Sequence, residues 1–414
     1  MERLTVPVAW FQEAGYRENT NPKSNDGVDA ALLLTLGRNA ASWLITEDRG
    51  VHAHARRLAL QERVMTLADG LSTLKALRGQ MPAHYGVDEV EPHTIDPAQP
   101  FFRSLEADYP DFRQWWEAKV VRQRRTCLLI GSGSSIHGLA VLDPQTAEVP
   151  ALSAHTLKIC TFKIDESQQG RKLGETLVDA VLAYARRNNY DGCFIETAEK
   201  QEGLLAMLRE FGFFHAGDKP GSSDQILAKI LNPKVDAGPP SDPLAYNRRY
   251  GPGRRLVERA FIVPIIPTYH GMLFPAAESQ PSLFDSTYGN AVRKVYICHS
   301  PMKILQPGDT LFFLRTHDRQ AVHAVGVVEE VIRTNELSEL LRFAGARTVY
   351  TVEELEEMCA KGVLAIKFRL DQVLDQPVNR QELRMLQVFD DSPQSIAQIK
   401  TQDGMEWARS LQNA

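Results

Sequence analysis

The chain has 414 residues and a formal net charge of −5. Its length predicts about two to four domains. Its apolar content of 43% and charged content of 24% are ordinary for a globular protein, and no run approaches the ~20 apolar residues of a membrane helix. The negative charge excludes a protein that coats nucleic acid along its whole surface, although a local basic patch stays open. Five scattered cysteines without CxxC spacing predict reduced, mostly buried thiols in a cytoplasmic protein. Because no membrane-length apolar run is found, no membrane partner is expected.

Residues 1–80 alternate between helical and strand patterns, which predicts a parallel sheet. The expected elements are a helix at 28–36, a strand at 42–46, a basic helix after Gly50, a strand at 62–67 and a helix at 68–77. Ligands of such sheets gather at the carboxyl ends of the strands, and Asp48 lies at one of these ends.

Residues 26–58 resemble the C-terminal half of a PIN nuclease domain, a family in which acidic residues hold Mg²⁺ or Mn²⁺ beside a phosphodiester. Asp29 (or Asp26) and Asp48 stand at two of the matching positions. The family's first strand, with its leading aspartate, does not precede them. We therefore expect a partial PIN-like domain without nuclease activity, and we assign no metal ligands. The alternative for Asp48 is a cap on the helix that follows it.

Residues 81–100 are rich in proline and acidic residues and are predicted to be a linker. Residues 101–232 form a central domain that begins with an amphipathic helical segment. The elements expected next are a hairpin at 127–142, strands at 157–164 and 190–197, helices from Leu173 and at 204–211, and a closing strand at 225–231.

The turn after the 157–164 strand reads Gln169-Gly170-Arg171-Lys172-Leu173-Gly174. A turn at a helix N-terminus leaves backbone N–H groups unpaired where the helix dipole is positive, which favours a pyrophosphate. Gly170 and Gly174 allow close approach of the backbone, and Arg171 and Lys172 add positive charge. The alternative is a plain strand-to-helix turn with two incidental glycines.

Residues 157–213 resemble the acetyl-CoA-binding half of the GNAT acetyltransferases. That family's pyrophosphate loop reads Gln/Arg-x-x-Gly-x-Gly/Ala, and here Gln169, Leu173 and Gly174 fit while Lys172 replaces the middle glycine. The family also ends this unit with a Gly-Phe pair, like Gly212-Phe213. A tyrosine often stands four residues before that glycine as the acid for the leaving thiolate, and this chain has Leu208 there.

The resemblance implies that acetyl-CoA lies where the 157–164 and 190–197 strands diverge. Backbone N–H groups near Phe162 and Ile164 would polarise the thioester carbonyl. Amides from Gln169 to Gly174 would hold the pyrophosphate. Glu196 is the candidate base for the acceptor amine, with Asp165 and Glu166 as weaker candidates, and Cys193 or water would protonate the thiolate. The alternative for Glu196 is a surface acid at a strand end.

Residues 233–253 are rich in proline and glycine and are predicted to be a second linker. In residues 254–414 the segment KILQPGDTLFFLRT…AVHAVGVVEEV resembles the PUA-like barrels of the ASCH and EVE type, which bind RNA or modified bases. Residues 248–320 carry ten basic residues against five acidic ones, so this half is predicted to contact phosphates. The candidate contacts are Arg293, Lys294, Arg315 and Arg319, unless these are scattered surface cations.

The predicted fold class is a multidomain α/β and α+β protein. It combines a partial PIN-like parallel sheet, a central GNAT mixed sheet with helices, and a C-terminal PUA-like β-barrel. The predicted function is acetyl-CoA-dependent N-acyl transfer, with an RNA-linked amine such as aminoacyl-tRNA or a modified base as the acceptor. The alternative is a catalytically inactive RNA-binding or regulatory protein built from the same three modules. Both rest on analogy at the level of fold.

Overall fold

The computed structural model describes residues 6–79, 85–145, 149, 152–153, 155–236, 238–277, 292–391 and 393–411. Within these ranges, no helix has both the length and the apolar character needed to cross a membrane. All five cysteines are free thiols, as predicted, and Cys127, Cys193 and Cys359 are buried. A cytoplasmic location stays a prediction.

The chain divides into two compact units. The first contains Met1–Pro82, Ile297–His299 and Ile332–Ala365, and the second contains Ala83–Tyr296, Ser300–Val331 and Ile366–Ala414. The five segments predicted from the sequence, with boundaries near residues 80, 100, 232 and 253, remain a prediction about domains.

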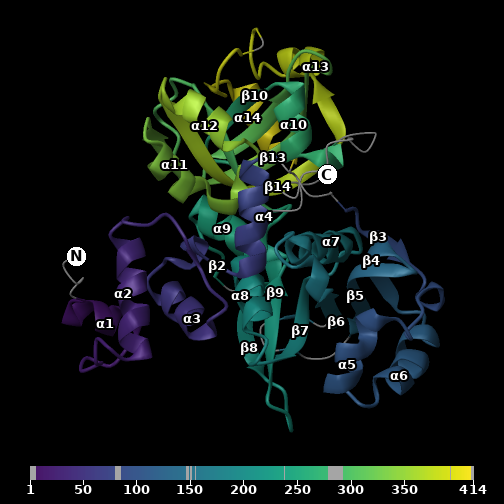
Figure 1. The fold of residues 1–414 in the computed structure, drawn as a ribbon. Helices are drawn as coiled ribbons and strands as arrows, with labels where there is room; N and C mark the ends of the chain where they lie inside the picture. The colour runs from purple at the N-terminus through teal and green to yellow at the C-terminus, as the bar shows by residue number, and fades with distance from the viewer. Residues whose placement is uncertain are drawn as a thin grey trace. The chain divides into compact units, whose positions relative to one another are not determined.

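The first unit is mainly helical (Figure 1). Its helices are α1 (Val8–Ala14), α2 (Asn25–Gly37), α3 (Arg49–Arg57), α4 (Leu67–Leu77), α11 (Leu337–Ala344) and α12 (Val352–Cys359). Two short strands, β1 (Leu44–Ile45) and β2 (Val64–Met65), pair in parallel as predicted. Leu33 and Leu36 of α2 pack with Val51 and Ala55 of α3 in a small core. The described part of this sheet has two strands, and nothing in it confirms a PIN-like domain.

A seven-stranded sheet forms the first half of the second unit, in the order β3-β4-β5-β6-β7-β9-β8. Its strands are β3 (Asp88–Val90), β4 (Thr126–Ser132), β5 (Ser135–Gln145), β6 (Thr156–Ile164), β7 (Gly192–Ala198), β8 (Phe214–Asp218) and β9 (Asp224–Ile230). β6 and β7 run parallel, and the other neighbours run antiparallel. The predicted mixed sheet is therefore confirmed.

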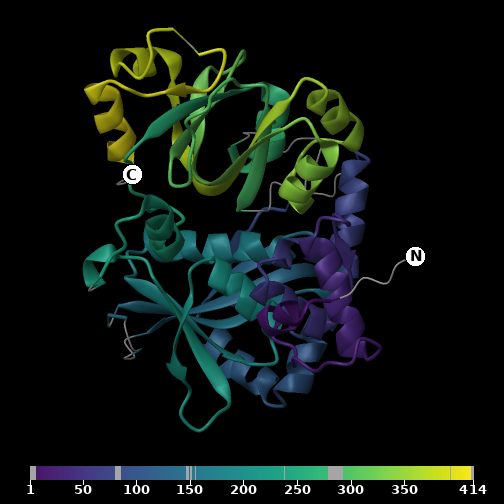
Figure 2. The same cartoon turned by 90° about the vertical axis from the view of Figure 1, so that its left-hand side faces the viewer.

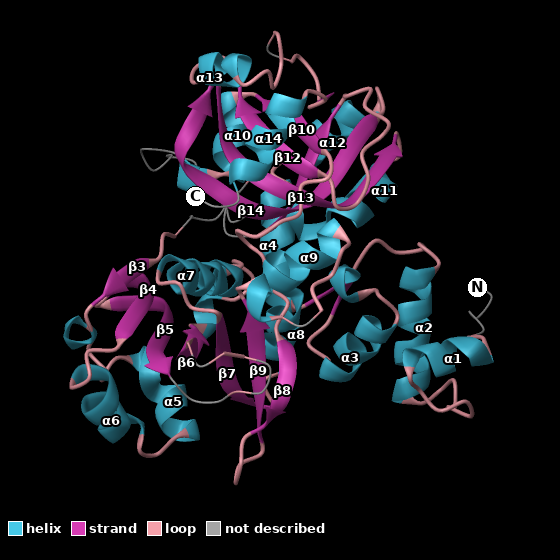
Figure 3. Cartoon of the chain, turned by 180° about the vertical axis from the view of Figure 1, so that it is seen from behind, coloured by secondary structure: helices cyan, strands magenta, loops and turns pink. Residues whose placement is uncertain are grey.

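Helices cover both faces of this sheet, as Figures 1 and 3 show. On one face α7 (Leu173–Arg187) and α8 (Glu202–Glu210) pack through residues such as Leu177, Val181 and Leu208. On the other face lie α5 (Arg103–Asp108), α6 (Phe112–Trp115) and a π-helical turn at Trp116–Val121. The helices predicted from Leu173 and at 204–211 are both confirmed.

Regular structure also lies inside both predicted linkers. β3 pairs with β4 at the edge of the seven-stranded sheet. In the second linker, α9 (Pro243–Tyr250) places Pro243 in its first turn, and the Asp242 side chain accepts a hydrogen bond from the Ala245 amide at 2.7 Å. Proline in the first turn costs a helix nothing, because that N–H has no partner inside the helix. Pro243 therefore begins a helix in a segment that was predicted to be a linker.

The last part of the chain forms a six-stranded sheet in the order β11-β14-β13-β12-β10-β15. Its elements are β10 (Ala260–Ile265), α10 (Pro267–Leu273), β11 (Arg293–Cys298), β12 (Thr310–Arg315), β13 (Ala321–Thr334), β14 (Val363–Asn379), α13 (Arg380–Met385), β15 (Ala397–Gln398) and α14 (Gln402–Ser410). Figure 2 shows α13 and α14 in yellow beside this sheet, and Trp407 of α14 packs against Phe312. In the residues that the structure describes, β11 and β15 are edges. The predicted closed barrel is therefore not seen there, because the two edge strands do not pair.

Candidate active site

The turn between β6 and α7 contains two residues in the left-handed backbone conformation. Gly170 has φ +77° and Lys172 has φ +56°. Glycine adopts this conformation without strain, while a residue with a Cβ meets its own carbonyl oxygen. Lys172 stands where the GNAT loop pattern has its middle glycine. The backbone at that position thus has the shape for which glycine is suited.

The N-terminus of α7 lacks a side-chain cap. Its N-cap residue is Lys172, whose side chain accepts no hydrogen bond from the first turn. In the described structure no backbone acceptor is found for the amides of Leu173 and Gly174. These N–H groups lie at the positive end of a 15-residue helix. Such an end is suited to hold phosphate oxygens.

Neighbouring side chains hold the turn in place. Arg171 donates to Gln168 Oε1 at 2.6 Å, and its guanidinium lies 4.9 Å from the ring centre of Tyr85. Gln169 is exposed and extended. A Cβ added to Gly174 would lie 2.9 Å from Met207 Sδ on α8. Gly174 therefore allows α8 to approach the first turn of α7.

β6 and β7 separate beyond the middle of β6. They pair from Thr156–Gly192 only as far as Ile159–Ile195, whereas β6 continues to Ile164 beside β5. Across from β5 the register shifts, since Val141 pairs with Thr161 and Leu142 with Ile159. Cys160 is thus an extra residue on β6, a β-bulge.

The open edge of β6 exposes the two amides predicted to act on the thioester. The Asp165 N–H donates to His137 O, on the β5 side of β6, at 2.9 Å. N–H groups alternate between the two edges along a strand. The amides of Phe162 and Ile164 therefore face the edge that β7 leaves open. A pre-placed pair of N–H donors at such an edge can stabilise negative charge on a carbonyl oxygen.

Glu196 lies on β7 just beyond this point of separation. Its two carboxylate oxygens accept hydrogen bonds from Lys158 Nζ and Lys219 Nζ, each at 2.8 Å. Partial burial acts to raise the pKa of Glu196, but the two lysine hydrogen bonds outweigh it and the pKa is lowered. Glu196 is therefore ionised, and it is a weaker base than a free glutamate. The sequence did not indicate either lysine as its partner.

Cys193 and Glu196 lie on opposite faces of β7. Side chains alternate along a strand, and Cys193 packs with Leu177 and Val181 in the core under α7, whereas Phe194 belongs to a cluster on the other face. Cys193 is fully buried, and burial raises the pKa of its thiol to about 12. This placement does not favour Cys193 as a proton donor to the thiolate. Leu208 is fully buried as well.

Asp48, one of the two acidic positions that resemble the PIN family, lies at the start of a helix. Asp48 Oδ1 accepts hydrogen bonds from the Gly50 amide at 2.7 Å and the Val51 amide at 3.2 Å. It therefore caps α3, which was the alternative considered for it. Burial raises the pKa of Asp29, and the charges of Asp48 and Asp26 add to this effect. Among the described residues, no group of three or more acidic, histidine or cysteine side chains could hold a metal ion.

The four cations proposed for nucleic acid do not gather on one open face. Arg293 pairs with Glu329 at 2.6 Å and with Glu210 at 3.1 Å. Lys294 is 1% exposed. Arg315 pairs with Asp318 at 2.6 Å, and Arg319 donates to the Ala277 carbonyl at 3.1 Å. Nucleic-acid binding by these residues stays a prediction, and three of them already face acidic or buried surroundings.

Lys229 is a buried lysine that was not predicted from the sequence. Lys229 on β9 pairs opposite Cys193 and is 0% exposed. Its Nζ donates to the carbonyl oxygen of Arg249 at 2.9 Å, at the C-terminal end of α9. Burial lowers the pKa of Lys229 to about 7. Its strand reads DQILAKI, and nothing in this pattern distinguishes a buried lysine from an exposed one.

The model of the Acetyltransferase (GNAT) family matches residues 91–213. These residues contain β4 to β7, the turn with Gly170 and Lys172, and α7 and α8. Residues 91–213 are therefore a GNAT acetyltransferase domain. The matched region starts inside the predicted first linker and ends at Phe213, the second residue of the predicted Gly-Phe pair.

Solved structures of two kinds resemble parts of the chain. A GNAT family acetyltransferase from Elizabethkingia anophelis with acetyl-CoA bound is 16% identical, with a TM-score of 0.27, 36% of this chain covered and 98% of that one. An IAA acetyltransferase from Bacillus cereus is 19% identical, with a TM-score of 0.26 and coverages of 35% and 97%. ASCH from Zymomonas mobilis is 10% identical, with a TM-score of 0.29 and coverages of 36% and 94%. No curated protein matches the chain in sequence.

Proposed function

We propose that the GNAT domain is an N-acetyltransferase that moves an acetyl group from acetyl-CoA to an amine. The observation that carries the proposal is the opening between β6 and β7 next to an uncapped helix N-terminus. The two features would supply donors for two polar groups of acetyl-CoA, its thioester carbonyl and its pyrophosphate. A domain that served only as a scaffold would have no use for unpaired donors at both places.

The hydrogen-bond donors and the positive charge at this site match the oxygen atoms of acetyl-CoA. The amides of Leu173 and Gly174, which have no acceptor in the described structure, would donate to pyrophosphate oxygens. Lys172 adds positive charge beside them. Acetyl-CoA, when bound, supplies an activated acyl group as a thioester. The amides of Phe162 and Ile164 would donate to the carbonyl oxygen and stabilise the negative charge that develops on it as the amine attacks.

The acceptor amine must lose a proton to attack. We propose Glu196 as the base. Its side chain is ionised, and it lies just past the point where β7 separates from β6. Both carboxylate oxygens already accept a hydrogen bond from a lysine, so we propose that the proton reaches Glu196 through water. Since Cys193 and Leu208 are buried in the core, water is the proposed proton source for the departing thiolate.

An RNA-linked amine remains our hypothesis for the acceptor. It is supported by the excess of ten basic over five acidic residues in 248–320 and by the sequence resemblance of the last domain to ASCH and EVE proteins. The pairing of Arg293 and Arg315 with acidic residues argues for a more general amine acceptor. A panel of free amines and aminoacyl-tRNA in the same assay separates these two possibilities.

A matched pair of glycine variants tests the proposal. In Gly174→Val the new side chain would press on Met207, since a Cβ alone lies 2.9 Å from its sulfur. Gly203→Val adds the same atoms on α8, where a Cβ meets nothing within 4 Å. We expect Gly174→Val to lose amine-dependent release of CoA from acetyl-CoA while Gly203→Val keeps it. Equal activity in the two variants would argue against a cofactor at this turn.

A further inference from the structure

The first residues of β11 reach the helices that hold the proposed cofactor turn. β11 is a strand of the six-stranded sheet, yet the Val292 side chain, just before it, is 4% exposed and belongs to the apolar cluster beneath α7. The Val292 N–H donates to Glu175 Oε2 at 3.1 Å. Glu175 lies in the first turn of α7, three residues after Lys172.

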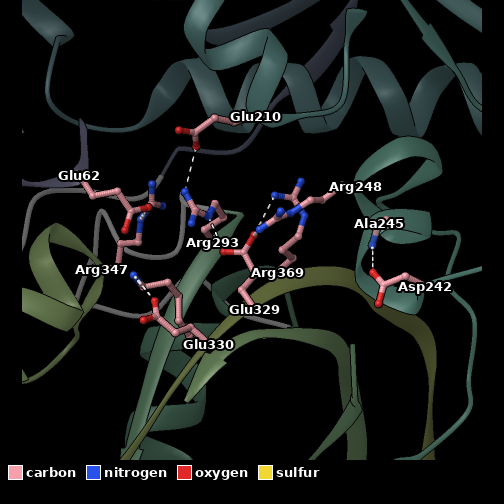
Figure 4. Close-up of polar contacts among 11 residues, drawn as sticks. Glu62, Glu210, Asp242, Ala245, Arg248, Arg293, Glu329, Glu330, Arg347 and Arg369 are labelled. Atoms are coloured by element: carbon pink, nitrogen blue, oxygen red, sulfur yellow. Dashed lines mark hydrogen bonds and ion pairs between the residues drawn. The ribbon is translucent and has the colours of Figure 1, made fainter. Parts of the chain in front are cut away.

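Arg293, the next residue, contacts the end of the second helix. Its Nε pairs with Glu329 Oε2 at 2.6 Å on β13, and its second guanidinium nitrogen pairs with Glu210 Oε2 at 3.1 Å. Figure 4 shows Arg293 between these two carboxylates. Glu329 is itself buried and accepts from Arg369 at 3.4 Å. Arg293 is thus fixed to its own sheet on one side and holds the last residue of α8 on the other.

The two contacts act at both sides of the same turn. The Glu175 carboxylate lies in the first turn of α7. Its negative charge would repel a phosphate that is bound to the N–H groups of this turn. The bond to Val292 fixes the position of this carboxylate. On the other side, α8 carries Met207 against Gly174. A shift of α8 would therefore move Met207, the side chain that packs against the turn at Gly174.

Lys294 follows Arg293 on β11 and is buried. It is 1% exposed, and its charge acts on Asp179 in the middle of α7. Removal from solvent raises the pKa of Asp179, while Arg186 and Lys294 act in the opposite direction. Val292 and Arg293 thus each contact an acidic residue of α7 or α8.

We propose that Val292 and Arg293 are positioning residues for acetyl-CoA, through which the six-stranded sheet controls the geometry of the cofactor turn. This inference rests on the proposed function, because it needs acetyl-CoA to bind at that turn. Linkage makes the effect reciprocal, so acetyl-CoA must in turn stabilise the contact of Val292 with Glu175. The consequence is that a change in the six-stranded sheet alters acetyl-CoA affinity without contacting the ligand.

The experiment uses the full chain and two readouts. Hydrogen exchange at the Val292 amide is followed with and without acetyl-CoA, and the dissociation constant for acetyl-CoA is measured for Glu210→Gln. Glu117→Gln is the matched control, since Glu117 is exposed and lies on the π-helical turn of the opposite face. We expect slower exchange at Val292 in the presence of acetyl-CoA. We expect the constant for Glu210→Gln to rise about two- to five-fold, the range of a partly exposed ion pair, with kcat and the melting temperature unchanged.

The outcomes separate this inference from the proposed function. Failure of the wild-type chain to bind acetyl-CoA would overturn both together. Normal binding with unchanged exchange at Val292, and the same dissociation constant in Glu210→Gln and Glu117→Gln, would overturn the positioning role alone. A lower melting temperature in Glu210→Gln without a change in affinity would show that the ion pair only stabilises the fold.

Discussion

At the scale of the residue, Lys172 determines how the proposed cofactor turn is built. It holds φ +56°, where an L-residue meets steric strain of about 1–2 kcal/mol. The strain is compensated if the position turns the following amides toward a ligand, as strained residues at functional sites often do. A glycine here would give the same backbone shape without strain.

We therefore expect Lys172→Gly to keep acetyl-CoA binding and to raise the free energy of unfolding by up to about 1 kcal/mol. Lys172→Val should lose binding, because a β-branched residue is a genuine outlier at positive φ. Denaturant titration and calorimetry measure the two quantities. If Lys172→Gly also loses binding, the lysine charge, and not the backbone shape, is what the turn requires.

Glu196 is the second residue whose role can be measured. Removal of a general base lowers kcat by about 10²- to 10⁴-fold, and Glu196→Gln should fall in this range while acetyl-CoA affinity stays within about two-fold. Glu199→Gln, at an exposed position after the same strand, is the control. Because the pKa of Glu196 is lowered below its ordinary value, this residue should give no loss of activity between about pH 6 and 8. A kcat of Glu196→Gln equal to that of the control would remove Glu196 from the mechanism.

At the scale of the element, the sequence predicted the strands and helices with a strong apolar period. β6, α7, β7 and α8 all lie within a few residues of their predicted positions. β3 and α9 were hidden in segments whose prolines and glycines are typical of linkers. The partners of charged residues were hidden as well, since Arg293 and Glu210 stand 83 residues apart. The apolar period of a sequence predicts which face of a helix or strand is buried. It does not predict which distant side chain contacts that face.

Lys229 links β9 to α9, and it predicts a pH dependence of stability. Its pKa in the folded chain is about 7, below the ordinary lysine value. Between these two values the unfolded chain binds more protons than the folded one, so stability rises with pH. The slope for one such group is at most about 1.4 kcal/mol per pH unit.

The comparison of wild type with Lys229→Met isolates this effect. From pH 7 to 8.5 the unfolding free energy of the wild type should rise more steeply than that of the variant, in which the titrating group is absent. Urea denaturation at several pH values gives both curves. Parallel curves would show that Lys229 titrates near its ordinary pKa in the folded chain.

At the scale of the whole molecule, the N-terminal unit is expected to have no metal-dependent nuclease activity. Asp48 already accepts hydrogen bonds from two helix amides, which occupies an oxygen that a metal would need. Incubation of the chain with RNA and Mg²⁺ or Mn²⁺ should leave the RNA intact. Cleavage that is present in the wild type and absent in Asp48→Asn would contradict this expectation.

The opening between β6 and β7 and the turn before α7 are together proposed to bind acetyl-CoA. Titration of the wild-type chain with acetyl-CoA in a calorimeter tests this proposal most directly, with Gly174→Val as the variant that crowds the turn against α8 and Gly203→Val as its control. We expect saturable binding at one site per chain, lost in Gly174→Val and kept in Gly203→Val. An absence of binding to the wild-type chain, or equal binding to all three proteins, would contradict the account.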